Sequence, residues 1–105
     1  MEKLELFIRD IMNNMPEYSL SLTCTAWRYK ECEYEYHDNE TDRDYLIDLP
    51  AIIKGYNILR KLWEDKKMIF TGVETERDWN DPGNWDADIA DALIQCSIFG
   101  EIIYA

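Results

Sequence analysis

The sequence lacks the features that mark membrane and secreted proteins. It contains no uninterrupted apolar run of about 18 residues, the length that a transmembrane helix requires. The opening stretch MEKLELFIRD places acidic residues inside its apolar part, so it lacks the layout of a signal peptide. We therefore expect a cytoplasmic protein.

Cysteine and histidine, two residues common in catalytic sites, are scarce in this sequence. Cys24, Cys32 and Cys96 form an odd, widely spaced set without a CxxC motif, which favours small buried side chains in a reducing compartment. His37 is the only histidine, and no Gly-rich phosphate loop is present. No Ser/His/Asp or Cys/His set can be assembled, so we expect neither an enzyme nor a cofactor.

Basic residues are outnumbered by acidic ones, and the imbalance is local. The chain has 105 residues, 22 of them acidic and 11 basic, for a formal net charge of −11. Two windows, Glu31–Asp48 and Glu74–Asp91, hold 15 of the acidic residues and only 2 of the basic ones. Such a charge disfavours direct binding to nucleic acid and favours a basic partner protein. An apolar content of 47% excludes an acidic disordered tail.

The apolar pattern of the first half predicts a helix followed by a sheet. Helical spacing of apolar residues over residues 2–14 predicts the helix. Alternation from residue 18 to residue 26, with Leu20 on the apolar side, predicts a first strand. Residues 31–36 and 44–47 predict two more strands. Their short connections indicate an antiparallel meander.

The second half predicts two further helices and one short strand. Asp48 as N-cap, with a proline in the first turn, predicts a helix from residue 49 to about residue 65. The apolar run Met68–Val73 predicts a fourth strand. A last helix is expected to begin at Asn84 or Asp86 and to end near Gly100. The chain is thus predicted to be a single α+β domain, residues 1–105, with a three- to four-stranded antiparallel meander and about three helices packed on one face.

Acidic residues in the two windows are the candidate partner-binding residues. Alternate residues on a strand lie about 6.6–6.8 Å apart, so Glu31, Glu33 and Glu35 would form a row of like charge, as a nucleic-acid backbone does. In the second window, acids surround Trp79, which suits an aromatic anchor in a basic groove. The predicted binding residues are Glu31, Glu33, Glu35, Asp42, Asp44, Asp78, Trp79, Asp81, Asp86 and Asp88.

A calcium loop is the rival interpretation of the second window. Counting from Asp78, Gly83 falls at the sixth position, as in an EF-hand. The twelfth position is Ile89, where that loop needs a bidentate glutamate. We therefore expect no metal site.

In size, in its helix–meander–helix organisation and in the acidic rows ECEYEYHDNETDRD and ETERDWNDPGNWDADIAD, the chain resembles the small acidic counter-defence proteins of phages and mobile elements. These are the anti-CRISPR and anti-restriction proteins, several of which are DNA mimics. No family motif is matched residue by residue, so the resemblance assigns no functional residue. It implies a non-enzymatic inhibitor in the cytoplasm of the host cell, occupying the basic channel of a nuclease or CRISPR effector.

The alternative is a mobile-element accessory or structural protein that self-associates, its acidity serving solubility only. Ile94 and Ile98 fall opposite the predicted core face of the last helix. This second apolar face would contact either another element of the chain or another subunit.

Overall fold

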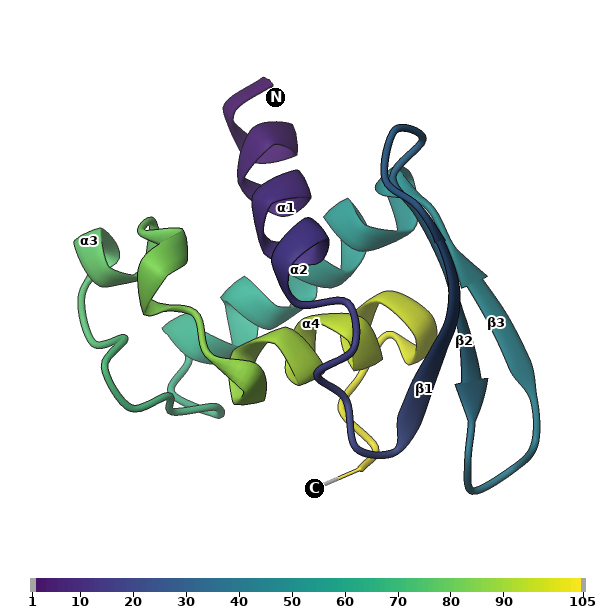
Figure 1. Ribbon diagram of the computed structural model, residues 1–105. Helices are drawn as coiled ribbons and strands as arrows, with labels where there is room; N and C mark the ends of the chain where they lie inside the picture. Colours follow the sequence, from purple (N-terminus) through teal and green to yellow (C-terminus); the bar gives the residue numbers. More distant parts are fainter. Residues whose placement is uncertain (1, 105) are drawn as a thin grey trace.

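The computed structural model describes residues 2–104 as four α-helices, a 3-10 turn and three strands (Figure 1). In chain order these are α1 (Glu2–Asn14), β1 (Leu22–Arg28), β2 (Glu33–Asp38), β3 (Asp44–Ile47), α2 (Leu49–Glu64), α3 (Glu76–Trp79), the 3-10 turn η1 (Pro82–Asn84) and α4 (Ala87–Phe99). Within this part of the chain, no helix has the length and apolarity needed to cross a membrane.

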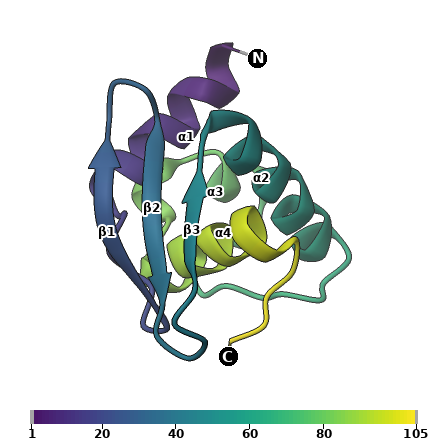
Figure 2. The same cartoon turned by 90° about the vertical axis from the view of Figure 1, so that its right-hand side faces the viewer.

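The three strands form one antiparallel sheet in the order β1-β2-β3, and the helices lie on one of its faces (Figure 2). This confirms the α+β prediction. Leu22, Tyr34, Tyr36 and Ile47 point inward and are buried. Each buried tyrosine hydroxyl has a partner, because Tyr34 donates to the Asn13 side chain at 2.8 Å and Tyr36 to the Pro16 carbonyl at 2.8 Å. The sheet is thereby fastened to the end of α1.

Helix α2 begins where the sequence predicts. The Asp48 side chain accepts a hydrogen bond from the Ala51 N–H at 3.1 Å, and Pro50 occupies the first turn. Gly55 lets α2 approach α4 closely, because a Cβ at this position would lie 2.4 Å from Ser97 Oγ and 2.6 Å from Ser97 N. The two helices therefore pack backbone against backbone at this point.

Helix α4 lies in the middle of the molecule, against α2 on one side and the sheet on the other (Figures 1 and 2). Ile94, which sequence periodicity places opposite the core face, is fully buried by the chain itself. Ile94 is therefore not available at the surface for the homo-oligomer contact predicted through Ile94 and Ile98, and Ile98 is half-buried. The second apolar face contacts other elements of the same chain.

Two sequence predictions about strands are also wrong. Met68–Val73 is an irregular loop with a single bridge between Phe70 and Val73. Gly72 turns the backbone with a φ of 85°, and the Phe70 and Val73 side chains are each buried in the core. Leu20 precedes β1 and is 98% exposed. The apolar run predicts the first segment and alternation predicts the second, but neither pattern specifies pairing with a neighbouring strand.

All three cysteines are free. Cys32 and Cys96 are buried and Cys24 is half-buried, and in each the burial raises the pKa of the thiol. Cys32 lies in the turn before β2, which begins at Glu33.

Candidate partner-binding surface

The outer face of the sheet carries no helix (Figure 2). Register places Glu33, Glu35 and His37 along the central strand β2, with Arg28 of β1 beside Glu33, and Asp44 of β3 beside His37. Leu46 lies beside Glu35 and is 57% exposed. We call the group Arg28, Glu33, Glu35, His37, Asp42, Asp44 and Leu46 the acidic sheet face.

Arg28 pairs with two of the predicted glutamates. Its guanidinium donates to the Glu33 carboxylate at 2.8 Å and to the Glu35 carboxylate at 3.0 Å, and these bonds raise the pKa of Arg28. Glu31 does not join the row. It lies in a turn that ends at Cys32, whose φ of 55° breaks the extended backbone before β2 starts. The predicted row of three glutamates is therefore a pair that shares one cation.

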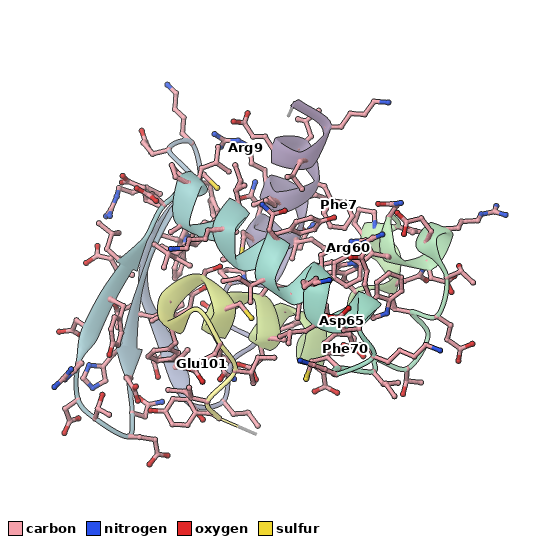
Figure 3. The ribbon with its side chains drawn as sticks, turned by 180° about the vertical axis from the view of Figure 1, so that it is seen from behind. Phe7, Arg9, Arg60, Asp65, Phe70 and Glu101 are labelled. Atoms are coloured by element: carbon pink, nitrogen blue, oxygen red, sulfur yellow. The ribbon has the colours of Figure 1, made fainter. Side chains whose placement is uncertain are left out.

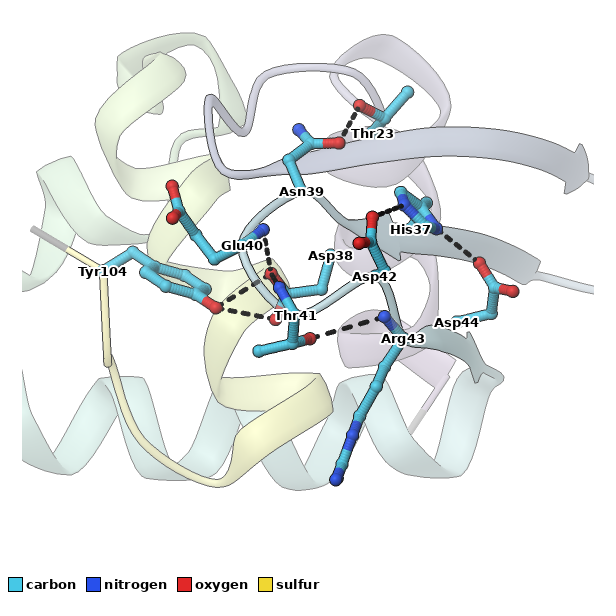
Figure 4. Close-up of polar contacts among 10 residues, drawn as sticks. All are labelled: Thr23, His37, Asp38, Asn39, Glu40, Thr41, Asp42, Arg43, Asp44 and Tyr104. Carbon is cyan, nitrogen blue, oxygen red and sulfur yellow. Dashed lines mark hydrogen bonds and ion pairs between the residues drawn. The ribbon is translucent and has the colours of Figure 1, made fainter.

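His37 and the loop between β2 and β3 complete the face (Figure 4). The Nδ1 atom of His37 is 2.8 Å from the Asp44 carboxylate, and its Nε2 atom is 3.2 Å from the Asp42 carboxylate. Asp42 adopts a φ of 61°, a conformation that aspartate tolerates better than most residues. Both aspartates are exposed, as predicted for partner binding.

The buried carboxylate of Asp38 holds the conformation of the β2–β3 loop through hydrogen bonds. Asp38 accepts hydrogen bonds from the Glu40 and Thr41 N–H groups at 2.9 and 3.3 Å and from the Tyr104 hydroxyl at 2.7 and 2.8 Å. Burial alone would raise the pKa of the Asp38 carboxyl, but these donors together lower it. Asp38 is thus fixed as an anion that holds the loop in shape.

Residues 74–85 of the second acidic window lie at the other end of the molecule. The sheet stands at one end of the ribbon and α3 with η1 at the other, and the second view places α3 behind the sheet and the central helices (Figures 1 and 2). The longest dimension of the molecule is 36 Å. Residues 74–85 therefore do not continue the acidic sheet face, whereas Asp88 and Asp91 lie near Tyr104, whose hydroxyl bonds Asp38.

Several aspartates of the second window form hydrogen bonds that cap the N-termini of helices. Asp78 completes a capping box with Thr75, Asp81 caps η1, and Asp86 caps α4. Backbone N–H donors at Glu74 and Thr75 lower the pKa of Asp78. Asp88 is exposed in the first turn of α4, where a negative charge suits the helix dipole.

Trp79 is fully buried, so its prediction as an exposed anchor is wrong. The Trp79 indole donates to the Tyr56 hydroxyl at 2.7 Å and stacks on Trp63 with ring centroids 4.8 Å apart. Arg60 projects from α2 and covers both tryptophans while pairing with Glu76 and Glu64 (Figure 3). Because Trp85 also packs on Trp79, this end of the molecule is an aromatic core.

Sequence reasoning missed Arg28, His37 and Leu46 as members of the acidic sheet face. His37 could have been found, because it continues the alternation of Glu33 and Glu35 by one step. Arg28 is placed there by the β1–β2 register, which shifts at a bulge between Cys24 and Ala26, and Leu46 by the β2–β3 register. Within residues 2–104, no cluster of three or more His, Cys, Asp or Glu side chains has the arrangement of a metal site.

No protein-family model, curated protein or solved structure matches the chain.

Proposed function

We propose that this protein is a non-enzymatic inhibitor that binds the basic nucleic-acid-binding surface of a nuclease or CRISPR effector through its acidic sheet face. The observation that supports this most is the uncovered outer side of the sheet, where Glu33, Glu35, Asp42 and Asp44 lie together. These four carboxylates contribute a surface of one dominant sign on a chain of net charge −11.

The charge geometry suits a surface that normally binds a phosphate backbone. Glu33 and Glu35 are two residues apart on an extended strand, a separation of about 6.6–6.8 Å. Asp44 and Asp42 continue the negative charge past His37 toward the loop. A regular line of charge steers a basic partner and competes with nucleic acid for the same lysine and arginine side chains.

Leu46 takes the place of Trp79 as the apolar contact in this proposal. It is exposed on the edge strand β3, beside Glu35. An apolar group next to charged residues gives a partner a small contact that can be desolvated beside a polar rim, as in other protein interfaces. Asp78, Asp81 and Asp86 are left out of the proposed surface because they cap helices at the far end of the molecule.

Charge reversal on the acidic sheet face tests the proposal. The double variant Glu35→Lys/Asp44→Lys should lose the capture of nucleic-acid-binding proteins from a bacterial lysate at low salt, with affinity for a purified captured partner falling about tenfold or more. The charge-matched control is Glu74→Lys/Glu101→Lys, because both of its glutamates are exposed and lie outside the acidic sheet face. Affinity capture followed by mass spectrometry and a binding titration measures the difference.

Two results would contradict the proposal. One is that the wild-type protein retains no nucleic-acid-binding protein at low salt. The other is that the two double variants weaken capture equally, which would mean that net charge matters and the acidic sheet face does not.

A further inference from the structure

The imidazole of His37 lies between two carboxylates, one at each ring nitrogen. The Nδ1 atom is 2.8 Å from Asp44, which belongs to the neighbouring strand, and Nε2 is 3.2 Å from Asp42, which belongs to the β2–β3 loop. Figure 4 shows the ring between the two side chains. A neutral imidazole carries one N–H donor and one acceptor nitrogen, so it can donate to only one carboxylate. Hydrogen bonds to both carboxylates at once therefore need the doubly protonated imidazolium.

We propose that His37 is a proton-controlled clamp that holds the β2–β3 loop to the sheet and sets the charge of the acidic sheet face. With both nitrogens protonated, the ring bonds the strand through Asp44 and the loop through Asp42. Loss of one proton leaves one N–H, which stays on Nδ1 because the Asp44 contact is the shorter. Asp42 then loses its partner, and the loop is released on that side.

The surroundings of the ring favour this switch. The charged groups on the same face are the carboxylates of Glu33, Glu35, Asp42 and Asp44 and the guanidinium of Arg28, and Arg28 is already bonded to both glutamates. Within residues 2–104, His37 is thus the only cation that pairs with the two aspartates. Hydrogen bonds from the ring to Asp44 first and to Asp42 second raise the pKa of His37 above its ordinary value. Because free histidine titrates near pH 6.5, a raised pKa moves the protonation change of His37 toward neutral pH.

The loop is built to respond to the clamp. Asp42 holds a positive φ, and its N–H donates to the Asp38 carbonyl at 2.8 Å. Asp38 is fixed by its own hydrogen bonds, so Asp42 is held to the sheet by two contacts, its N–H bond to the Asp38 carbonyl and its carboxylate contact with His37. Because the folded-state pKa is raised, the stabilisation from the clamp is fully present below the ordinary histidine pKa and is lost as the pH rises through the raised value.

One consequence rests on the proposed function. Protonated, the acidic sheet face sets four carboxylates against two cations, and deprotonated, it sets them against one. Affinity for a basic partner should therefore increase as the pH rises through the pKa of His37.

The clamp is tested on the isolated protein, without any partner. NMR titration of the His37 ring, the only histidine signal of the chain, should give a pKa above the ordinary value, with both nitrogens protonated on the acid side. Asp44→Asn and Asp42→Asn should each lower that pKa, Asp44→Asn more strongly, and the double variant should return it to the ordinary value. Hydrogen-exchange protection of the Asp42 amide should fall above the wild-type pKa.

The matched control is Glu40→Gln, which removes one charge from the same loop without touching the ring. It should leave the pKa of His37 close to the wild-type value. A wild-type pKa at the ordinary value, or equal shifts in Glu40→Gln and Asp42→Asn, would overturn the clamp. Because these readouts need no partner, their failure is distinguishable from failure of the proposed function, which the capture experiment tests separately.

Discussion

At the scale of single residues, a carboxylate can serve either the surface or the backbone, and the two uses look alike in a sequence. Asp38, Asp48, Asp78, Asp81 and Asp86 all accept hydrogen bonds from backbone N–H groups at turns or helix starts. Each satisfies donors that would otherwise lack a partner. Part of the acidity of both windows is therefore structural.

Removal of a capping carboxylate should cost stability. Asp86 accepts from the N–H groups of Asp88 at 3.0 Å and Ile89 at 3.1 Å, at the start of the buried helix α4. Asp86→Ala should lower the free energy of unfolding by about 1 kcal/mol, while Asp86→Asn should be nearly neutral because asparagine caps equally well. Urea unfolding followed by tryptophan fluorescence measures both, and equal losses in the two variants would show that charge, and not capping, is what Asp86 contributes.

Local sequence rules identify some of these residues and miss others. Asp48 is recognisable as an N-cap because Pro50 follows it, and Asp86 because an apolar helical pattern follows. Asp78 closes the motif Thr75-x-x-Asp78, a signature of a capping box, but the carboxylates around it suggest a binding surface instead. Burial of Trp79 had no local signal, because it depends on Tyr56 and Trp63 from a helix earlier in the chain.

At the scale of elements, close packing of α2 on α4 depends on Gly55. Glycine in a helix interior ordinarily costs about 1 kcal/mol relative to alanine, so its presence in α2 calls for a reason. The reason is Ser97, whose backbone nitrogen would lie 2.6 Å from an added Cβ. Neither helix can give way cheaply, because α4 is also packed against the sheet.

Gly55→Ala should therefore destabilise the protein despite the better helix propensity of alanine. We expect the free energy of unfolding to fall by about 1–3 kcal/mol, the usual cost of overpacking a core. Asn57→Ala, an exposed change in the same helix, provides the control and should change stability little. A more stable Gly55→Ala variant in thermal or urea unfolding would contradict the close approach of the two helices.

The positions of helices and strands can be predicted from the sequence where the local pattern is strong. The predictions are wrong where tertiary contacts determine the structure of the segment. The helix at 2–14, the strand at 44–47 and the start of α2 are confirmed, because periodicity or capping marks each of them. Met68–Val73 has the composition of a strand but pairs with no strand of the sheet, since Phe70 and Val73 fill the core separately. Ile94 looks exposed by periodicity and is buried because α4 is covered on both sides.

At the scale of the whole molecule, the first acidic window and residues 74–85 of the second lie at opposite ends, although the two windows resemble each other in sequence. The first window forms a sheet surface and its adjoining loop, and residues 74–85 wrap an aromatic core at the opposite end. The C-terminal segment returns to the first window, where the Tyr104 hydroxyl bonds Asp38 across 66 positions of sequence. Sequence alone gives the amount of charge but not this separation, which depends on how β3, α2 and α4 pack.

The central claim is that the acidic sheet face occupies a nucleic-acid-binding surface on its partner, and a competition titration tests it most directly. A fluorescently labelled DNA or RNA is bound to the purified captured partner, and the wild-type protein is added at low and at high salt. We expect full displacement of the nucleic acid with no ternary species, weakening steeply as salt rises, and no displacement by Glu35→Lys/Asp44→Lys. A stable ternary complex of partner, nucleic acid and this protein would contradict the claim.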